Sequence, residues 1–463
     1  MFLRISSIVS RHIAAYSNSK MMLLPLTIFE KYMFLDDRPE YPMDSFRQLT
    51  FSGHLDIDVF LQSIAAAVRW NPMLRSVVKQ AGRNCFWEET DAPFSVRRSQ
   101  GTESPIPERI QLQNEPGFKV YTAEAEEQTR KQTKVLLQFH HSVSDGIGEM
   151  QFIGDVLSDY NIRVTGQTPP ENPRKLDPAL LPLRGQSGLT LKSYLRNFLH
   201  TTFTTRQLLF GKPDPLAPCS GTQTTLDKYY AFCHQELSLE ETSQYFAAAK
   251  TNNVTVNDIL LRDLFLTMGQ WRQRWVDQRT NPMFRVAVPM NLRTEQHRNI
   301  PAANVVTMLF LDRRLKQCLV NPEQLLQGVR REMDWIKKTE QKHYLLTTLQ
   351  VRDLVFGGLG PLLRLPQCRT TVVFSNLGRV WESLPLPRRE DGCLKAGEAV
   401  LESADATPPI RPGTLISFSA LTYAGRIRFI LRYDPLNMTA EQANDFLQRF
   451  LMSIRASSLS RPQ

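Results

Sequence analysis

Apolar residues recur along this chain with two different spacings, one typical of helices and one typical of strands. From Ile57 to Val68 they return every three or four residues, which predicts an amphipathic helix that packs on a sheet. A strand is predicted just before it, at 47–53. The Asn71-Pro72 pair predicts the end of the helix, because a residue before proline avoids the helical region. The segment therefore reads as strand, helix and turn.

The same two patterns continue through the rest of the chain. Strands are predicted at 75–80, 85–88, 135–140, 284–289, 304–311, 415–422 and 426–433. Helices are predicted from Gly146 onward, at 189–209, after a cap at Thr255, at 322–342 and from Thr439 onward. Ala424-Gly425 predicts a hairpin between the last two strands. Because strands and helices alternate in both halves, the fold is predicted to be α/β with two comparable lobes.

Prolines crowd the stretch from 161 to 188, which predicts an irregular connection between the lobes. We expect an N-terminal lobe at 21–187 and a C-terminal lobe at 188–463 that begins with a connecting helix. Residues 1–20 carry no acidic side chain and several basic ones, a composition similar to that of an organellar transit peptide. We favour a start codon placed too early, with Met21 or Met22 as the true first residue, and treat 1–20 as an extension.

Composition and charge narrow the class of protein. The 463 residues are 42% hydrophobic and 22% charged, which is ordinary globular composition and excludes collagen, a disordered tail and a membrane bundle. No apolar run approaches the ~20 residues that span a bilayer. The net charge of +10 favours anionic partners such as phosphates, acidic carrier proteins, nucleic acid or anionic lipid. The alternative is a basic surface with no dedicated partner.

The 6 cysteines are scattered and form no Cys-x-x-Cys pair. His234, next to Cys233, has no second pair of residues at zinc spacing, so we expect no metal site. Reduced thiols are typical of the cytosol, and we therefore expect a cytoplasmic protein.

Residues 140–146, His-His-Ser-Val-Ser-Asp-Gly, concentrate ionisable groups between an apolar strand and a helix. Side chains alternate along a strand, so His140 and His141 cannot face the same way. A structural role suits His140, whereas His141 can take a proton from a hydroxyl or amine that attacks a carbonyl. Asp145 can orient the histidine or anchor the turn to an arginine. Gly146 is expected to allow a tight backbone path into the helix.

This segment resembles the His-His-x-x-x-Asp-Gly signature of one acyltransferase superfamily. That superfamily includes nonribosomal peptide condensation domains, chloramphenicol acetyltransferase, plant BAHD acyltransferases and wax ester synthase/diacylglycerol acyltransferases. Four further blocks resemble the family in its order along the chain: 51–78, 255–261, 288–293 (VPMNLR) and 372–378 (VVFSNLG). The resemblance thus covers most of the chain.

The resemblance implies two lobes like those of chloramphenicol acetyltransferase, with an active-site tunnel between them. It implies that His141 is the general base, that Asp145 pairs with Arg293, and that acyl transfer proceeds without an acyl-enzyme. The donor would be acyl-CoA or a phosphopantetheinyl acyl carrier protein, with no bound cofactor, and the acceptor a small alcohol or amine. Ser375 and Asn376 are the candidate oxyanion donors; the alternative is that they only cap the strand end.

Departures from the family pattern reduce the number of branches that this sequence can resemble. The sequence lacks the Asp-Phe-Gly-Trp-Gly block of the plant enzymes and the N-terminal Pro-Leu-Trp of wax ester synthases. Asn304 resembles a Gly-Asn position of the family, but Ala303 replaces the glycine, and we assign no site role there. We expect a free-standing, monomeric transferase. Two alternatives stay open: a related protein that only docks a partner, and a basic nucleic-acid-binding protein.

Overall fold

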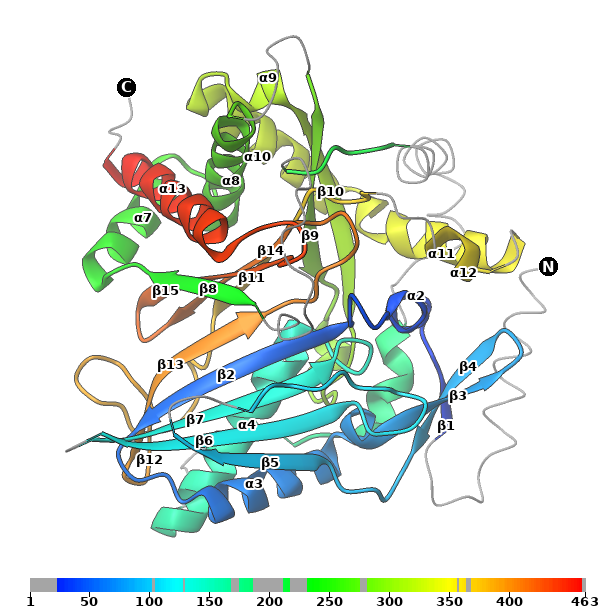
Figure 1. Cartoon of the computed structure of the whole chain (residues 1–463), viewed down its shortest axis with the longest axis vertical. Coiled ribbons are helices and arrows are strands. Elements are labelled where there is room, and N and C mark those ends of the chain that lie inside the picture. The colour runs from blue at the N-terminus through cyan, green and yellow to red at the C-terminus, as the bar shows by residue number, and fades with distance from the viewer. Residues whose placement is uncertain are drawn as a thin grey trace.

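The computed structural model describes residues 23–101, 105–127, 130–167, 175–185, 211–216, 231–274, 281–355, 358–363 and 368–459. They form two six-stranded mixed sheets and one three-stranded sheet, with helices packed around them (Figure 1). The predicted extension at 1–20, the connecting helix at 189–209 and the lobe boundary at 187/188 lie outside these residues. The prediction of an α/β fold is confirmed, and each of the two six-stranded sheets is mixed.

The first sheet has the order β12-β13-β2-β7-β6-β5. Its strands are β2 (Asp44–Ser52), β5 (Ser95–Gln100), β6 (Phe118–Glu127), β7 (Arg130–His140), β12 (Lys395–Ala396) and β13 (Ala399–Thr407). Only the β5 and β6 pair is parallel among these neighbours. Helices α3 (Ile57–Trp70) and α4 (Gly146–Thr165) cover one face of this sheet (Figure 1).

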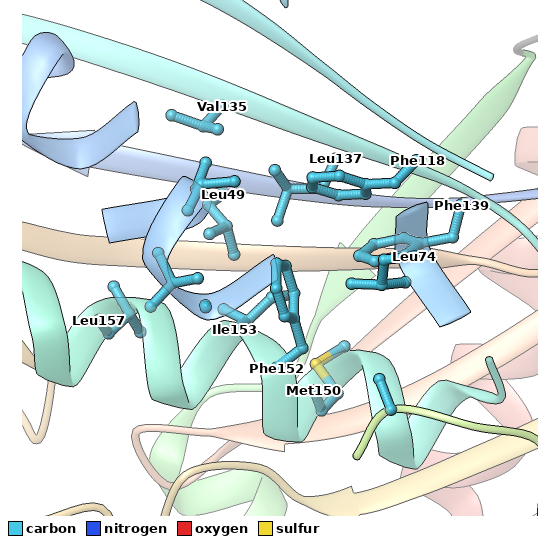
Figure 2. Packing of buried hydrophobic residues seen from close by; sticks show 14 of the residues in the cluster. Leu49, Leu74, Phe118, Val135, Leu137, Phe139, Met150, Phe152, Ile153 and Leu157 are labelled. Atoms are coloured by element: carbon cyan, nitrogen blue, oxygen red, sulfur yellow. The ribbon is translucent and has the colours of Figure 1, made fainter. Parts of the chain in front are cut away.

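Every second side chain of β7 contributes to the apolar core between this sheet and α4. Phe139 and Leu137 point toward α4, where they meet Phe152 and Ile153 (Figure 2). Every second residue of β7 therefore faces the helix, and His140 must lie on the opposite face of the sheet. The register of an apolar strand thus decides which way the first histidine points.

The second sheet has the order β10-β9-β11-β14-β15-β8. Its strands are β8 (Phe232–Glu236), β9 (Met283–Asn291), β10 (Val306–Arg314), β11 (Val372–Arg379), β14 (Ile416–Tyr423) and β15 (Arg426–Tyr433). Strand β11 runs parallel to β9 and β14, and the other pairs are antiparallel. One face packs against helices α7 (Leu239–Thr251), α8 (Val256–Arg272), α10 (Pro322–Lys338) and α13 (Ala440–Leu459).

The remaining elements are the three strands of the smallest sheet, β1-β4-β3, together with short helices and turns. They are β1 (Leu23–Pro25), β3 (Ser76–Ala81), β4 (Asn84–Glu89), α2 (Ile28–Asp36), α9 (Leu315–Cys318), α11 (Tyr344–Val355), α12 (Gly360–Leu363) and 3-10 turns at Pro72–Arg75, Pro178–Gly185, Glu295–His297 and Glu340–His343. Helices α2, α11 and α12 share a small apolar cluster next to β10. No helix in the described part of the chain is long and apolar enough to cross a bilayer.

Most predicted elements are present, several strands begin or end a few residues away from the predicted positions, and two helices end differently. Helix α4 continues to Thr165, into the stretch predicted to be irregular, and stops where Gly166 adopts the left-handed conformation. Helix α10 ends at Lys338 rather than 342, because Thr339 is already extended. The capping box at Thr255 and the hairpin at Ala424-Gly425 are confirmed.

Strands β12 and β13 come from the C-terminal part of the sequence but complete the first sheet. Strand β13 pairs antiparallel with β2, so β2 is not an edge strand. The boundary predicted at 187/188 assigns β12 and β13 to the C-terminal lobe, although both strands pair within the first sheet. Their position places residues 395–407 next to the second sheet, where Asp405 accepts a hydrogen bond from Arg428 of β15.

Candidate active site

A cavity of about 100 Å³ lies between the two six-stranded sheets. From the side of the first sheet it is lined by His141, Arg47 and Gly146, and from the second sheet by Ser375 and Met308, among others. The His141 side chain is 21% exposed. The ring is therefore not sealed inside one lobe and can be reached from a space that both lobes form.

The hydrogen bond made by His141 fixes its tautomer. Its Nδ1 lies 3.1 Å from the carbonyl oxygen of Ser144. A carbonyl can only accept a hydrogen bond, so in the neutral ring the proton sits on Nδ1 and the lone pair on Nε2. Nε2 is then available to take a proton from a bound molecule, as a general base must.

A buried carboxylate that the sequence analysis missed lies behind this ring. Glu149, in the first turn of α4, is fully buried, and its Oε1 lies 3.6 Å from Nδ1 of His141. Ser45 donates a hydrogen bond to the same oxygen at 2.9 Å, and Arg47 Nη2 lies 2.6 Å from Oε2. A fixed negative charge at this place stabilises the imidazolium that forms when Nε2 takes a proton.

Replacing Glu149 with glutamine is expected to lower kcat of the reaction proposed below by about 10-fold, with little change in KM. The amide keeps the shape of the side chain but removes the negative charge beside the ring. Steady-state kinetics measure the effect, with the exposed Glu390→Gln as the matched control. An unchanged kcat in folded Glu149→Gln would contradict this role.

Asp145 ties the start of α4 to the loop that precedes β10. Its Oδ1 accepts from the Gly148 N–H at 2.9 Å, which caps the helix. Its Oδ2 accepts from Arg293 Nη1 and from the Val305 N–H, both at 2.8 Å. The Asp145–Arg293 pair is the one that the family resemblance implies, and with the carboxylate 3% exposed it holds the turn in place.

Glycine is required at position 146 for a different reason from the one that the sequence predicted. Its φ is not in the left-handed region, so the backbone path does not require glycine. A Cβ at this position would instead lie 2.7 Å from Cδ2 of Leu377, on β11 of the other sheet, and 3.4 Å from Nη2 of Arg47. Glycine lets the helix approach the second sheet at the cavity wall.

Gly146→Ala is expected to destabilise the protein by about 1 kcal/mol, at the low end for overpacking because the end of the Leu377 side chain can rotate away. Chemical denaturation measures the loss. In the Leu377→Ala background the same substitution should cost nothing further. A full cost in that background would show that the contact between Gly146 and Leu377 is not the cause.

His140 is fully buried and contacts residues of the fold rather than the cavity. Its Nδ1 accepts from the Ser142 N–H at 3.2 Å, and its Nε2 lies 3.9 Å from Oδ2 of Asp37. Burial alone would raise the pKa of Asp37, but His140, Arg109 and the Met43 N–H together hold that pKa below its usual value. The geometry matches the structural role predicted for His140.

The lowered pKa of Asp37 predicts acid sensitivity. A depressed carboxyl pKa stabilises the fold above the unfolded value of about 3.9, and this contribution is lost as the pH falls through the folded value. Asp37→Asn should therefore flatten the dependence of stability on pH below about 4. Denaturant unfolding at several acidic pH values measures this, and an unchanged slope would contradict it.

Of the two candidate oxyanion donors, the structure brings one to the cavity. Val373, Ser375 and Leu377 of β11 line it in alternation. Asn376 points the other way, is exposed, and accepts a hydrogen bond from the Gly378 N–H at 2.9 Å. For Asn376 this geometry matches the turn-capping alternative, and it does not support an oxyanion role.

Asn304, to which the sequence analysis assigned no role, holds the histidine turn. Its Nδ2 donates to the carbonyl oxygens of His141 at 3.0 Å and Ser142 at 2.7 Å, and the residue is 3% exposed. The replacement of the preceding glycine by Ala303 leaves this contact intact. Asn304 is a positioning residue that acts through the backbone of the turn.

One feature of the sequence indicated the buried ion pair of Arg47 and Glu149 behind His141. Arg47 falls on the same face of β2 as Leu49 and Phe51, which are core residues. A charged residue at an apolar position of a buried strand indicates a buried partner. That partner, Glu149, follows 102 residues later, so no local pattern identifies it.

Among the described residues, one group of side chains with the atoms that bind metals lies outside the His141 cavity. Asp391, Cys393 and Glu402 place their ligand atoms within 4.8 Å of one another. The guanidinium of Arg389 donates to both carboxylates, at 2.7 Å to each through Nη2. A cation of the protein already pairs with both acids, so the arrangement is that of a surface ion-pair cluster.

Comparison with known proteins gives a clear result for the fold. No protein-family model and no curated protein matches the sequence. Among solved structures, an epimerization domain of tyrocidine synthetase B is 16% identical with a TM-score of 0.64, and the match covers 95% of this chain and 96% of that one. Trichothecene 15-O-acetyltransferase from Fusarium sporotrichioides is 12% identical with a TM-score of 0.67, covering 95% of each chain.

A starter condensation domain of rhizomide synthetase, solved as a mutant with C8-CoA, is 14% identical with a TM-score of 0.61 and 96% coverage of both chains. At these identities the likeness concerns the fold. The chain therefore shares the two-lobed fold of these condensation-type domains and of the trichothecene acetyltransferase, which is the fold that the resemblance of residues 140–146 implies.

Proposed function

We propose that this chain is an acyltransferase that moves an acyl group from an acyl thioester to a hydroxyl or amine, with His141 as the general base. One observation carries the proposal. The ring of His141 lines a cavity between the sheets with its lone pair on Nε2, while Ser144 and Glu149 hold the opposite side of the ring.

The proposed reaction has two steps. The acceptor gives its proton to Nε2 of His141 while its oxygen or nitrogen forms a bond to the thioester carbonyl carbon. The resulting tetrahedral oxyanion needs a donor, and the hydroxyl of Ser375 is the candidate in the cavity wall. Collapse of the intermediate breaks the carbon–sulfur bond, and the leaving thiolate takes the proton back from Nε2. The acyl group is never bonded to the enzyme.

The donor class is proposed on charge and on likeness. Acyl-CoA and acyl carrier proteins are anionic, and a net charge of +10 attracts anionic molecules over long distances. A domain of the same fold has been solved with C8-CoA. A cytoplasmic location and a monomeric state stay predictions from the sequence.

A thiol-release assay tests the proposal. Acyl-CoA donors of graded length, and the same acyl groups on a phosphopantetheinyl carrier protein, are offered with a panel of alcohols and amines. We expect thiol release that requires an acceptor and yields the ester or amide. No turnover with any donor and acceptor would contradict the proposal. A salt-sensitive shift of arbitrary DNA or RNA without turnover would favour the nucleic-acid-binding alternative.

A further inference from the structure

The wall of the His141 cavity continues into a second cavity of about 90 Å³. Five residues line both cavities: Phe29, Tyr32, Met308, Val373 and Arg411. Helix α2 supplies Phe29 and Tyr32, while strands of the second sheet supply Met308 and Val373. A substrate that reacts at His141 can therefore reach the wall that the two cavities share.

This shared wall lies close to the reacting atoms. Ser375, the candidate oxyanion donor, follows Val373 by two residues on β11, and both residues line the His141 cavity. A strand rises about 3.3 Å per residue, so the two positions are about 7 Å apart. An extended chain advances roughly 1.2 Å per covalent bond, so a substrate atom at the shared wall is about five or six bonds from the reacting atom.

Tyr32 brings to this wall a hydroxyl that takes part in no hydrogen bond among the described residues. A buried tyrosine hydroxyl usually has a partner. Burial raises the pKa of Tyr32 to about 12, so the hydroxyl keeps its proton and can both donate and accept. Four other polar side chains of the His141 cavity already bind groups of the protein: Arg47, Asp145, Arg411 and Ser419.

The ring that carries this hydroxyl is held from two sides. It stacks on Phe29, one turn earlier in α2, with the ring centroids 5.8 Å apart and 12° between the planes. The guanidinium carbon of Arg411 lies 5.2 Å from the ring centroid, and the buried carboxylate of Asp36 pairs with that arginine. Helix α2 is itself anchored, because its buried Glu30 accepts a hydrogen bond of 2.8 Å from Arg184. The fixed ring loses little conformational freedom when its hydroxyl binds a ligand.

We propose that the hydroxyl of Tyr32 selects a substrate with a second uncharged hydrogen-bonding group, a hydroxyl or a carbonyl, about five or six bonds from the reacting atom. This inference rests on the proposed function and names its substrate class. The second group belongs either to the acceptor or to the acyl chain. A substrate without it would exclude water from the Tyr32 hydroxyl and offer no hydrogen bond in return, which is how a polar group in an apolar wall discriminates.

Tyr32→Phe tests this contact, because it removes the hydroxyl and keeps the ring between its two neighbours. Two pairs of probes each differ by one hydroxyl. Hexanoyl-CoA and 6-hydroxyhexanoyl-CoA are titrated into the full-length protein by calorimetry without an acceptor, and 1-pentanol and 1,5-pentanediol are followed by saturation-transfer NMR. In one pair, the affinity of the hydroxylated probe relative to the plain one should be about 3- to 10-fold higher in the parent than in Tyr32→Phe.

The matched control is Tyr433→Phe, which removes a hydroxyl from a tyrosine of β15 that lines neither cavity. It should leave both affinity ratios unchanged. Ratios that are the same in the parent and in folded Tyr32→Phe, for both pairs, would overturn the proposal. An equal loss for both members of a pair would also overturn it, because the hydroxyl would then contact the part that the two probes share.

A second measurement needs no variant, and it decides the matter should Tyr32→Phe fail to fold. The hydroxyl is moved along the chain, from carbon 3 to carbon 6 of hydroxyhexanoyl-CoA and from 1,3-propanediol to 1,6-hexanediol. In one of the two series, affinity for the parent should be highest where the hydroxyl stands about five or six bonds from the reacting atom. No dependence on the position of the hydroxyl in either series would overturn the proposal.

Kinetics then assign the second group to the donor or to the acceptor. Tyr32→Phe should lower kcat/KM for the hydroxylated substrate of one kind only and leave the plain substrates unchanged, a pattern that a loss of packing would not produce. A preference that depends on the Tyr32 hydroxyl without any acyl transfer would leave the contact standing and refute the proposed function. Acyl transfer with no such preference would do the reverse.

Discussion

Replacing His141 with alanine is expected to lower kcat of acyl transfer by about 10²–10⁴-fold, the usual contribution of a general base. KM for the thioester should change little, because the ring takes a proton from the acceptor and does not hold the donor. The side chain is 21% exposed, so its loss should cost less than about 1 kcal/mol of stability. Thiol release measures the rate, and chemical denaturation measures the stability.

The matched control is His54→Ala, which removes an exposed histidine from the loop between β2 and α3 and should leave the rate unchanged. Added imidazole should restore part of the activity of His141→Ala, because a free base can enter the cavity. If His141→Ala transfers acyl groups as fast as the parent, general-base catalysis by this residue is wrong. A docking protein without transfer would show no thiol release that depends on this ring.

Local elements were predictable because their signals lie within a few residues. The apolar stripe of α3, the capping box at Thr255 and the hairpin at Ala424-Gly425 each appear in the structure where the sequence placed them. Alternation along β7 also placed His140 on the face away from α4, where it is buried, and His141, the first residue after the strand, lines the cavity. These features depend on backbone periodicity, which the sequence shows directly.

The features that sequence reasoning missed depend on contacts between distant parts of the chain. Strand β13 pairs with β2 across more than 340 residues, and the ion pair of Arg47 with Glu149 joins a strand to a later helix. The alternation that turns Asn376 away from the cavity follows from the register of β11 between β9 and β14. Register across a sheet is set by tertiary packing, so the residues of 375–376 alone could not decide it.

Asp145→Asn is expected to lower both stability and rate, and for one reason. The carboxylate is 3% exposed and pairs with Arg293 while it caps α4. Removing one partner of a buried ion pair leaves the other charge uncompensated, which typically costs about 3–5 kcal/mol. The turn that carries His141 would then lose its attachment to the loop before β10, and kcat should fall with the fraction of molecules that hold the ring in place.

Denaturant unfolding and thiol release on Asp145→Asn, Arg293→Gln and the double variant separate the two possible roles. If the pair acts through structure, the double variant should be less destabilised than the sum of the single variants, because neither charge is left buried alone. Arg293→Gln should also lower the rate in parallel with Asp145→Asn. An Asp145→Asn variant that unfolds like the parent but has lost its activity would instead place Asp145 in the chemical step itself.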